Sequence, residues 1–322
     1  MNWSGEAERG GERLTRAGLA VVHGFGWPAG RVIATASAGW FLLRSPGARR
    51  ASADYLRRIL GRPATWADVA HHFDQFATAV LDRVLLLSDR DGLYTIEVEG
   101  LDALLAVLAQ GRGVILLGAH LGSFEVLRTL ARRAPVPVWA LMYRRNAGAL
   151  TALLDRLAPQ LRERILEIGD TASLIQAREC VERGEIVGIL ADRAPPGHRR
   201  VPAAFLGGVA HFPSGPFVLA ATLAAPVFLC HAVCVGKRHY RIGMAPFADK
   251  VVLRRGDRDA DLRLVVAAYA DAIAELCRAH PFQWFNFFPF WESPHVENHD
   301  APPGPAQPRA ASAARLRSTR PG

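Results

Sequence analysis

The pattern of hydrophobic positions divides the chain into a helical front part and an alternating remainder. Between residues 49 and 90, apolar residues recur three and four positions apart, which predicts two helices broken at Gly61 and Pro63. From Leu101, short apolar runs alternate with amphipathic stretches. The runs at 114–118, 136–142, 164–169, 185–192, 226–234 and 239–244 predict strands, and the stretches at 101–110, 123–133, 149–157, 171–183, 216–224 and 259–279 predict helices.

Strands that alternate with helices of about 10 to 15 residues indicate an α/β fold with a largely parallel central sheet flanked by helices. We predict an N-terminal helical segment at 1–95, which could associate with a membrane, and an α/β domain at 96–299. The tail at 300–322 is rich in Pro, Ala and Arg and has no apolar period, so we predict that it is disordered.

The apolar stretch at 17–43 is interrupted by His23, Pro28 and Arg31. A spanning helix needs roughly 20 nearly uninterrupted apolar residues, so this stretch is expected to lie on a membrane or pack into the core rather than to span a bilayer. The tryptophans at positions 3, 27 and 40 fit either a headgroup layer or a core.

The net charge of +9 and the pI near 10.1 favour anionic partners, which include nucleic acid, lipid headgroups and acidic carrier proteins. No nucleic-acid motif is visible and the basic residues are dispersed, so we expect no nucleic-acid partner. The 4 cysteines lack C-x2-C spacing, which indicates neither disulfides nor zinc and fits a reducing cytoplasm. We expect no cofactor and no metal, since His71 and His72 have no carboxylates at ligand spacing.

The segment VILLGAHLGSFE at 114–125 carries the most informative chemistry, because an apolar strand ends just before His120 in a glycine-flanked turn. Ligands of open α/β sheets bind beyond the carboxyl ends of the strands. A histidine there can accept the proton of an attacking hydroxyl, and a carboxylate on its other nitrogen fixes the tautomer. We predict His120 as general base and Glu125 as its orienting partner, with backbone N–H groups near Gly122 or later arginines stabilising an oxyanion. A histidine with a purely structural role is the alternative that spacing alone leaves open.

The stretch AHLGSFE resembles the H-x4-D/E motif of the lysophospholipid acyltransferase superfamily, and the match is closest to its lipid A biosynthesis (lauroyl/myristoyl) acyltransferase branch. The stretches MYRRN, ADRAPPGHRRVPAAFLGG and HFPSGPFVLAATLAAPVF resemble later blocks of that branch, and the resemblance covers roughly residues 100 to 290. The chain departs from the familiar members in two features. It has no clean transmembrane anchor before the domain, and its aromatic run WFNFFPFW is unusually rich.

The resemblance implies transfer of a fatty acyl group from an acyl carrier protein or coenzyme A to a hydroxyl of a lipid or glycolipid, as in lipid A synthesis. It implies work at the cytoplasmic face of a bacterial inner membrane by a peripheral or weakly anchored protein. Arg144 or Arg145 and Asn146 would border the acceptor, and Asp192 and Arg193 would lie at the catalytic pocket. Another membrane lipid or an acylated pigment is an alternative acceptor, and a noncatalytic lipid-binding relative is an alternative function.

Several motifs also have plainer interpretations. Arginines 144 and 145 could form a solvated edge, Asp192 could simply pair with Arg193, and the basic loop of Arg193, His198, Arg199 and Arg200 could serve solubility rather than contact lipid phosphates or an acidic carrier. Phe205, Leu206 and Gly207 are expected to form a packed, buried edge. The run at 284–291 is expected to close the core rather than line an acyl channel. A serine hydrolase would need G-x-S-x-G, which the context of Ser123 does not supply.

Overall fold

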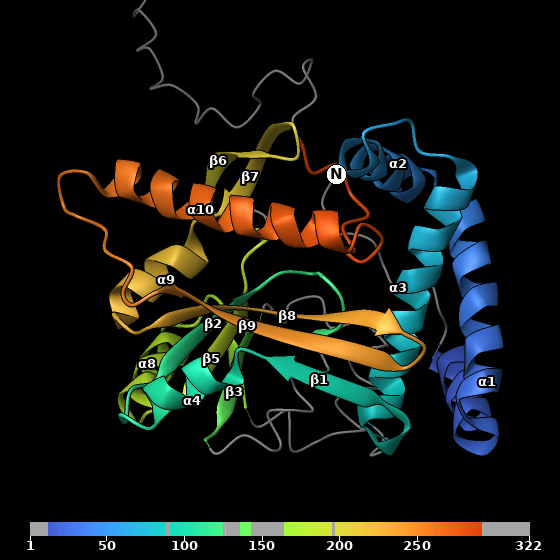
Figure 1. Ribbon diagram of the computed structural model, residues 1–322, viewed down its shortest axis with the longest axis horizontal. Helices are drawn as coiled ribbons and strands as arrows, with labels where there is room; N and C mark the ends of the chain where they lie inside the picture. Colours follow the sequence, from blue (N-terminus) through green and yellow to red (C-terminus); the bar gives the residue numbers. More distant parts are fainter. Residues whose placement is uncertain are drawn as a thin grey trace, which may run out of the picture. The chain divides into compact units, whose positions relative to one another are not determined.

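The computed structural model describes residues 12–87, 91–124, 126, 136–142, 164–194 and 197–291, and the described residues belong to one compact unit that ends at Trp291 (Figure 1). The helices are α1 (Glu12–Arg44), α2 (Pro46–Leu60), α3 (Trp66–Leu87), α4 (Leu101–Leu108), α8 (Thr171–Glu182), α9 (Gly215–Leu223) and α10 (Arg258–Ala279), with a 3-10 turn η2 (Asp91–Leu93). The strands are β1 (Thr95–Glu99), β2 (Val114–Gly118), β3 (Val138–Met142), β4 (Ile165–Glu167), β5 (Ile186–Leu190), β6 (Arg200–Phe205), β7 (Gly208–Pro213), β8 (Val227–Gly236) and β9 (His239–Ala248).

A seven-stranded sheet in the order β1, β9, β8, β2, β5, β3, β4 organises the fold. Strands β8, β2, β5, β3 and β4 run parallel to one another, whereas β9 is antiparallel to β8. The carboxyl ends of the five parallel strands therefore lie along one edge of the sheet. In Figure 1, α10 runs across the sheet beside the β6–β7 hairpin, and α1 and α3 stand side by side.

The central strands are apolar throughout because both faces of the sheet are covered. Every residue of β2 is buried. Ile115 and Leu117 join a core cluster with α2, α3, α8, α9 and α10, while Val114 and Leu116 join a second cluster with α1, α3 and α4. This two-sided burial explains the continuous hydrophobic runs in the sequence, which are typical of parallel strands.

The front helices pack on the sheet through a buried carboxylate. Asp82 of α3 accepts hydrogen bonds from Trp27 of α1 (3.0 Å), from Tyr94 beside β1 (2.8 Å) and from Tyr240 of β9 (2.7 Å). Burial raises the pKa of Asp82, and the donors, led by Tyr240, oppose this shift. One side chain thus ties α1 and α3 to the edge of the sheet.

Replacing Asp82 by alanine is expected to lower the free energy of unfolding by roughly 2 to 5 kcal/mol, because two buried tyrosine hydroxyls and the partly buried Trp27 N–H lose their acceptor. The midpoint of urea denaturation measures the change. Asp249→Ala is the control, since Asp249 pairs with Arg112 at the surface and should change stability by less than about 1 kcal/mol. Equal effects of the two variants would contradict the structural role of Asp82.

The predicted fold class is confirmed, and the strands at 138–142, 165–167, 186–190, 227–236 and 239–248 lie where the sequence predicted them. The helical break is confirmed as well, because α2 ends before Gly61, whose φ of 66° is left-handed. Strand β1 and the β6–β7 hairpin were missed. The predicted helical stretches at 127–133 and 149–157 lie outside the described residues, and the boundaries at 95 and 299 stay predictions.

The apolar stretch at 17–43 lies in α1, which is kinked at Gly26. Ala34, Ala38 and Leu42 are buried, whereas Val32, Trp40 and Leu43 are 71%, 47% and 69% exposed. One face of α1 thus packs on the core while another carries apolar side chains to the surface. In the part of the chain that the structure describes, every helix falls short of the length and apolarity that crossing a bilayer would require.

Candidate active site

Two neighbouring parallel strands bring His120 and Asp192 together. Gly118 and Leu190, the last residues of β2 and β5, are partners in the sheet register. Each strand continues two residues further, to His120 and to Asp192. The His120 ring Nδ1 lies 2.8 Å from Asp192 Oδ1, and the His120 backbone N–H donates to Asp192 Oδ2 at 2.9 Å. The sheet register therefore forms a histidine–carboxylate pair at its carboxyl edge.

The segment after α10 completes the surroundings of Asp192. Residues 283–286 run along residues 120–122, where Phe285 N–H donates to the His120 carbonyl and Gly122 N–H donates to the Gln283 carbonyl, each at 2.8 Å. Trp284 Nε1 and Asn286 Nδ2 both donate to Asp192 Oδ2, at 3.1 and 3.3 Å. One carboxylate oxygen therefore accepts three N–H groups, and the other faces the imidazole.

Asp192 is fully buried, whereas the side chain of His120 is 31% exposed. Burial and then the positive charge of Arg193 lower the pKa of His120, and the Asp192 carboxylate offsets only part of this shift. Burial alone would raise the pKa of Asp192, but its interactions with His120 and Arg193 outweigh burial, so this pKa lies well below its usual range. At neutral pH the pair is a neutral imidazole held by a carboxylate.

Arg193 is built into the same site rather than into a solvent loop. Its Nε donates to Asn286 Oδ1 at 2.8 Å, its Nη2 donates to the Phe285 carbonyl at 2.5 Å, and its guanidinium lies over the Phe288 ring. Burial lowers the pKa of Arg193 to about 10, with Asp192 acting in the opposite direction, so the group stays charged at neutral pH. Asn286 thereby links Arg193 to Asp192.

Gly122 lets the turn after His120 approach strand β8 closely. Its φ is +70°, and a Cβ there would lie 1.9 Å from the Ala232 carbonyl oxygen. Only glycine fits this backbone. The turn is thus held between β8 and residues 283–286, and this fixes the position of His120 at the end of β2.

A comparison with protein families decides what kind of protein carries this site. The family model described as "Bacterial lipid A biosynthesis acyltransferase" matches residues 13–293 of this chain. The chain belongs to this family. The members are lipid A-type acyltransferases, so the predicted family and the general activity of acyl transfer are both confirmed. A search of curated proteins gave no match.

The structure describes three of the site residues predicted for this acyltransferase. His120, Asp192 and Arg193 lie together, as described above. Glu125, Arg144, Arg145 and Asn146 lie outside the described residues, so their roles stay predictions. Among the described residues, no cluster of three or more His, Cys, Asp or Glu side chains could hold a metal ion.

The structure narrows the predicted donors to an oxyanion. The Gly122 N–H donates to the Gln283 carbonyl and the Ser123 N–H donates to the Ala232 carbonyl, so these two amides are occupied and the later arginines are the favoured donors. Arg193 does not belong to the exposed basic loop, since Asn286 and Phe285 hold it. In that loop, Arg199 pairs with Asp259 at 2.9 Å.

The expectations about packing in this acyltransferase are largely confirmed. Phe205 and Leu206 are buried, although Gly207 is exposed, and the run at 284–291 packs in the core around the fully buried Trp284. All four cysteines are free thiols. Trp284 and Asn286 were missed as parts of the site. In the sequence, the one indication that this segment reaches the site is a polar residue, Asn286, within an aromatic run.

Proposed function

We propose that this protein transfers a fatty acyl group from an acyl thioester to a hydroxyl of a lipid or glycolipid acceptor of the lipid A type, with His120 as general base. The observation that supports this proposal is the Asp192 carboxylate on His120 Nδ1. A carboxylate there favours the tautomer with a proton on Nδ1 and leaves the lone pair on Nε2. Nε2 is then the nitrogen that can accept a proton.

The proposed reaction is direct transfer. The acceptor oxygen attacks the thioester carbonyl while its proton passes to His120 Nε2, and a C–O bond forms. The C–S bond then breaks, and the imidazolium returns the proton to the thiolate that leaves. Asp192 stabilises the imidazolium between these steps, and the N–H groups of Arg193 that do not bind Asn286 or Phe285 would stabilise the oxyanion.

The lowered pKa of His120 supports this role. A general base must be unprotonated when the acceptor binds, and burial together with Arg193 keeps the imidazole neutral near pH 7. Glu125 of the H-x4-E motif stays our predicted orienting partner of His120, in addition to Asp192. Arg144, Arg145 and Asn146 stay predicted acceptor contacts, and either an acyl carrier protein or coenzyme A stays the predicted donor.

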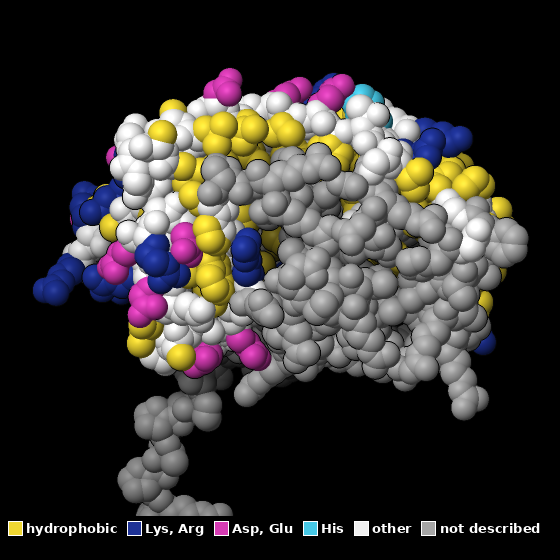
Figure 2. All heavy atoms as spheres, turned by 90° about the horizontal axis from the view of Figure 1, so that it is seen from below, with side chains coloured by type: hydrophobic (Ala, Val, Ile, Leu, Met, Phe, Trp, Pro, Cys, Tyr) yellow, Lys and Arg dark blue, Asp and Glu magenta, His cyan; other side chains and the backbone are white. Residues whose placement is uncertain are grey.

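We further propose that the protein works at the cytoplasmic face of a bacterial inner membrane as a peripheral protein. The exposed residues Val32, Ala36, Trp40 and Leu43 recur at helical spacing, and together they form an apolar stripe on α1. Such a stripe can lie in the headgroup layer of a bilayer. Figure 2 shows hydrophobic side chains gathered at the edge of the molecule where α1 lies.

Mass spectrometry of lipids from cells with and without the gene tests the proposed function. We expect one lipid or glycolipid to lose a single acyl chain in the deletion strain and to regain it when the wild-type gene is returned. The purified protein should transfer the same chain to that lipid from an acyl carrier protein or from coenzyme A. Identical lipid profiles in both strains, with no transfer in vitro, would argue against the proposal. An acylated product that is not a glycolipid would favour another membrane lipid or a pigment as acceptor.

A further inference from the structure

A cavity of about 500 Å³ opens between α1, α3, the β8–β9 turn and the segment after α10. Its lining includes the cationic side chains of Arg31, Lys237 and Arg238 together with His71 and His280. Among the described residues that line it, none is an aspartate or glutamate. Figure 2 shows basic side chains next to hydrophobic ones at the edge of the molecule where this turn meets α1. The chemistry of the lining therefore favours an anion.

Two of the cations, Lys237 and Arg238, form no ion pair with any residue that the structure describes. The Lys237 ammonium and the Arg238 guanidinium lie 5.3 and 5.9 Å from the centre of the Trp27 ring. The buried Nε of Arg238 has no hydrogen-bond partner in the part of the chain that the structure describes. By contrast, Arg31 is bound to Asp74, with Nη1 and Oδ1 2.9 Å apart. Lys237 and Arg238 are therefore the side chains with capacity left for a ligand.

The backbone at Arg238 is unfavourable for an arginine. Gly236 and His239 are sheet partners, so Lys237 and Arg238 form a two-residue turn, and Arg238 has a left-handed φ of 56°. Asparagine or glycine adopts this conformation with less strain. A strained arginine with an unsatisfied buried donor at the wall of a cavity points to a role for its side chain.

The cavity lies next to both the apolar stripe and the candidate active site. Trp27 and Arg31 come from the same helix as Val32 and Trp40, and Val235 of the hairpin is also exposed. Gln283 lines the cavity, and its carbonyl accepts the N–H of Gly122, two residues from His120. An anion bound here would lie beside a membrane-facing helix and close in the chain to the catalytic turn.

We propose that this cavity binds the phosphate group of a lipid, with Lys237 and Arg238 as its ligands. The proposal rests on the proposed function, because it takes the acceptor or its membrane to be lipid. Ammonium and guanidinium groups beside a hydrophobic rim suit a phosphate that is attached to acyl chains.

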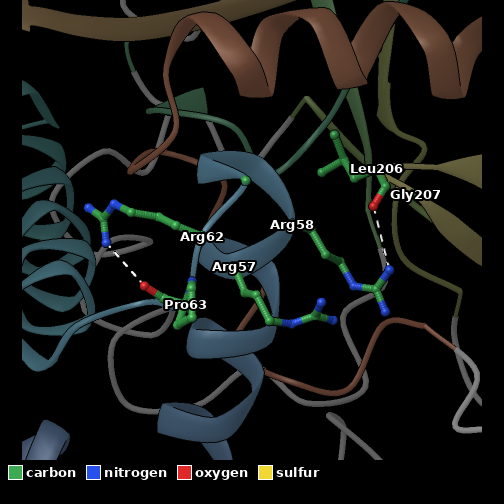
Figure 3. A pocket seen from close by; sticks show the side chains of 7 residues that line it. Arg57, Arg58, Arg62, Pro63, Leu206 and Gly207 are labelled. Carbon is green, nitrogen blue, oxygen red and sulfur yellow. Dashed lines mark hydrogen bonds between the residues drawn. The ribbon is translucent and has the colours of Figure 1, made fainter.

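A second basic cavity has a volume of about 420 Å³, but its arginines are paired with carboxylates. It is lined by Arg57, Arg58 and Arg62 beside the β6–β7 turn. Arg57 and Arg58 both bind Asp54, and Arg62 binds Asp68. Figure 3 shows Arg62 directed away from the other two and bonded to the Pro63 carbonyl. Its arginines are already paired, so the Lys237–Arg238 cavity is the stronger phosphate site.

The test compares vesicle binding by the full-length double variant Lys237→Gln, Arg238→Asn with that of wild type. Asparagine suits the left-handed φ at 238, so the variant should fold. The matched control is Arg255→Gln, Arg263→Gln, which removes two exposed charges elsewhere. Phosphatidylcholine vesicles carry either phosphatidate or, at equal surface charge, oleate. Binding needs no catalysis, so this result stands apart from any failure of acyl transfer.

We expect the Lys237–Arg238 variant to bind phosphatidate vesicles about 10- to 30-fold more weakly than wild type, and the control less than about 3-fold more weakly. Wild type should prefer phosphatidate to oleate, and the variant should lose that preference. Equal losses of vesicle affinity in the variant and the control would show that only the net charge of the protein matters, and would overturn the proposal. Unchanged vesicle binding, with inorganic phosphate still stabilising wild type and not the variant, would assign the cavity to a soluble phosphate and overturn the lipid ligand.

Discussion

Replacing His120 by glutamine is expected to lower kcat/KM for acyl transfer by about 10²- to 10⁴-fold, the usual contribution of a general base. The fold should survive, because Asp192 keeps its bonds from the His120 backbone N–H, Trp284 and Asn286. The glutamine amide can also donate to the carboxylate in place of Nδ1. Initial rates with an acyl thioester donor and the acceptor lipid measure the loss, and the unfolding midpoint checks the fold.

Ser123→Ala is the matched control for that experiment. Ser123 lies three residues from His120 in the same turn, and it is only 5% exposed. Direct transfer requires no serine nucleophile, so this variant should keep its rate within about threefold, whereas a hydrolase mechanism would lose nearly all of it. A His120→Gln protein that transfers acyl groups at the wild-type rate would show that His120 is not the general base.

Asp192→Asn is expected to lower kcat/KM by on the order of 10³-fold, through the tautomer of His120. Oδ2 of Asp192 accepts three N–H donors, so the amide oxygen of an asparagine must occupy that position. The amide nitrogen then faces His120 Nδ1, where it donates a hydrogen bond. The imidazole proton moves to Nε2, and the nitrogen that faces the acceptor can no longer accept a proton.

Steady-state kinetics of this variant, beside Glu125→Gln, separate the two carboxylates. We expect Asp192→Asn to reduce kcat with little change in the unfolding midpoint, because the side-chain shape and most of its hydrogen bonds persist. We also expect a substantial loss of kcat for Glu125→Gln, because Glu125 is the carboxylate of the H-x4-E motif. Wild-type kcat in Asp192→Asn would show that the carboxylate on Nδ1 does not hold the base.

The fold and half of the catalytic pair could be predicted from the sequence for a definite physical reason. The strands of the parallel sheet are buried on both faces, so β2 and β5 appear as apolar runs, and His120 follows the first of them directly. The pairing of β2 with β5, however, depends on strand order. Strand order is a long-range property that apolar periodicity does not encode, so Asp192 was predicted at the pocket but not as the partner of the imidazole.

The remaining differences arise from contacts that are distant in sequence. Trp284 and Asn286 reach Asp192 across 92 and 94 positions, and their aromatic surroundings suggested only core packing. Among the strands that the structure describes, β1 pairs with β9 alone, at the edge of the sheet. Its residues alternate between exposed and half-buried, which gives a weak apolar signal. In the β6–β7 hairpin, the turn residue Leu206 has a φ of 46°, which its type does not predict.

The state of the His120 ring tests the central claim most directly. In ¹⁵N NMR of protein labelled at its 11 histidines, the signals absent from His120→Gln identify this ring. We predict a neutral imidazole at pH 7 with the proton on Nδ1 and a bare Nε2, and a pKa below the ordinary value of about 6.5. Acyl transfer should be lost as the pH falls through that pKa, because the base becomes protonated. A ring that is charged at pH 7, or that carries its proton on Nε2, would contradict the account.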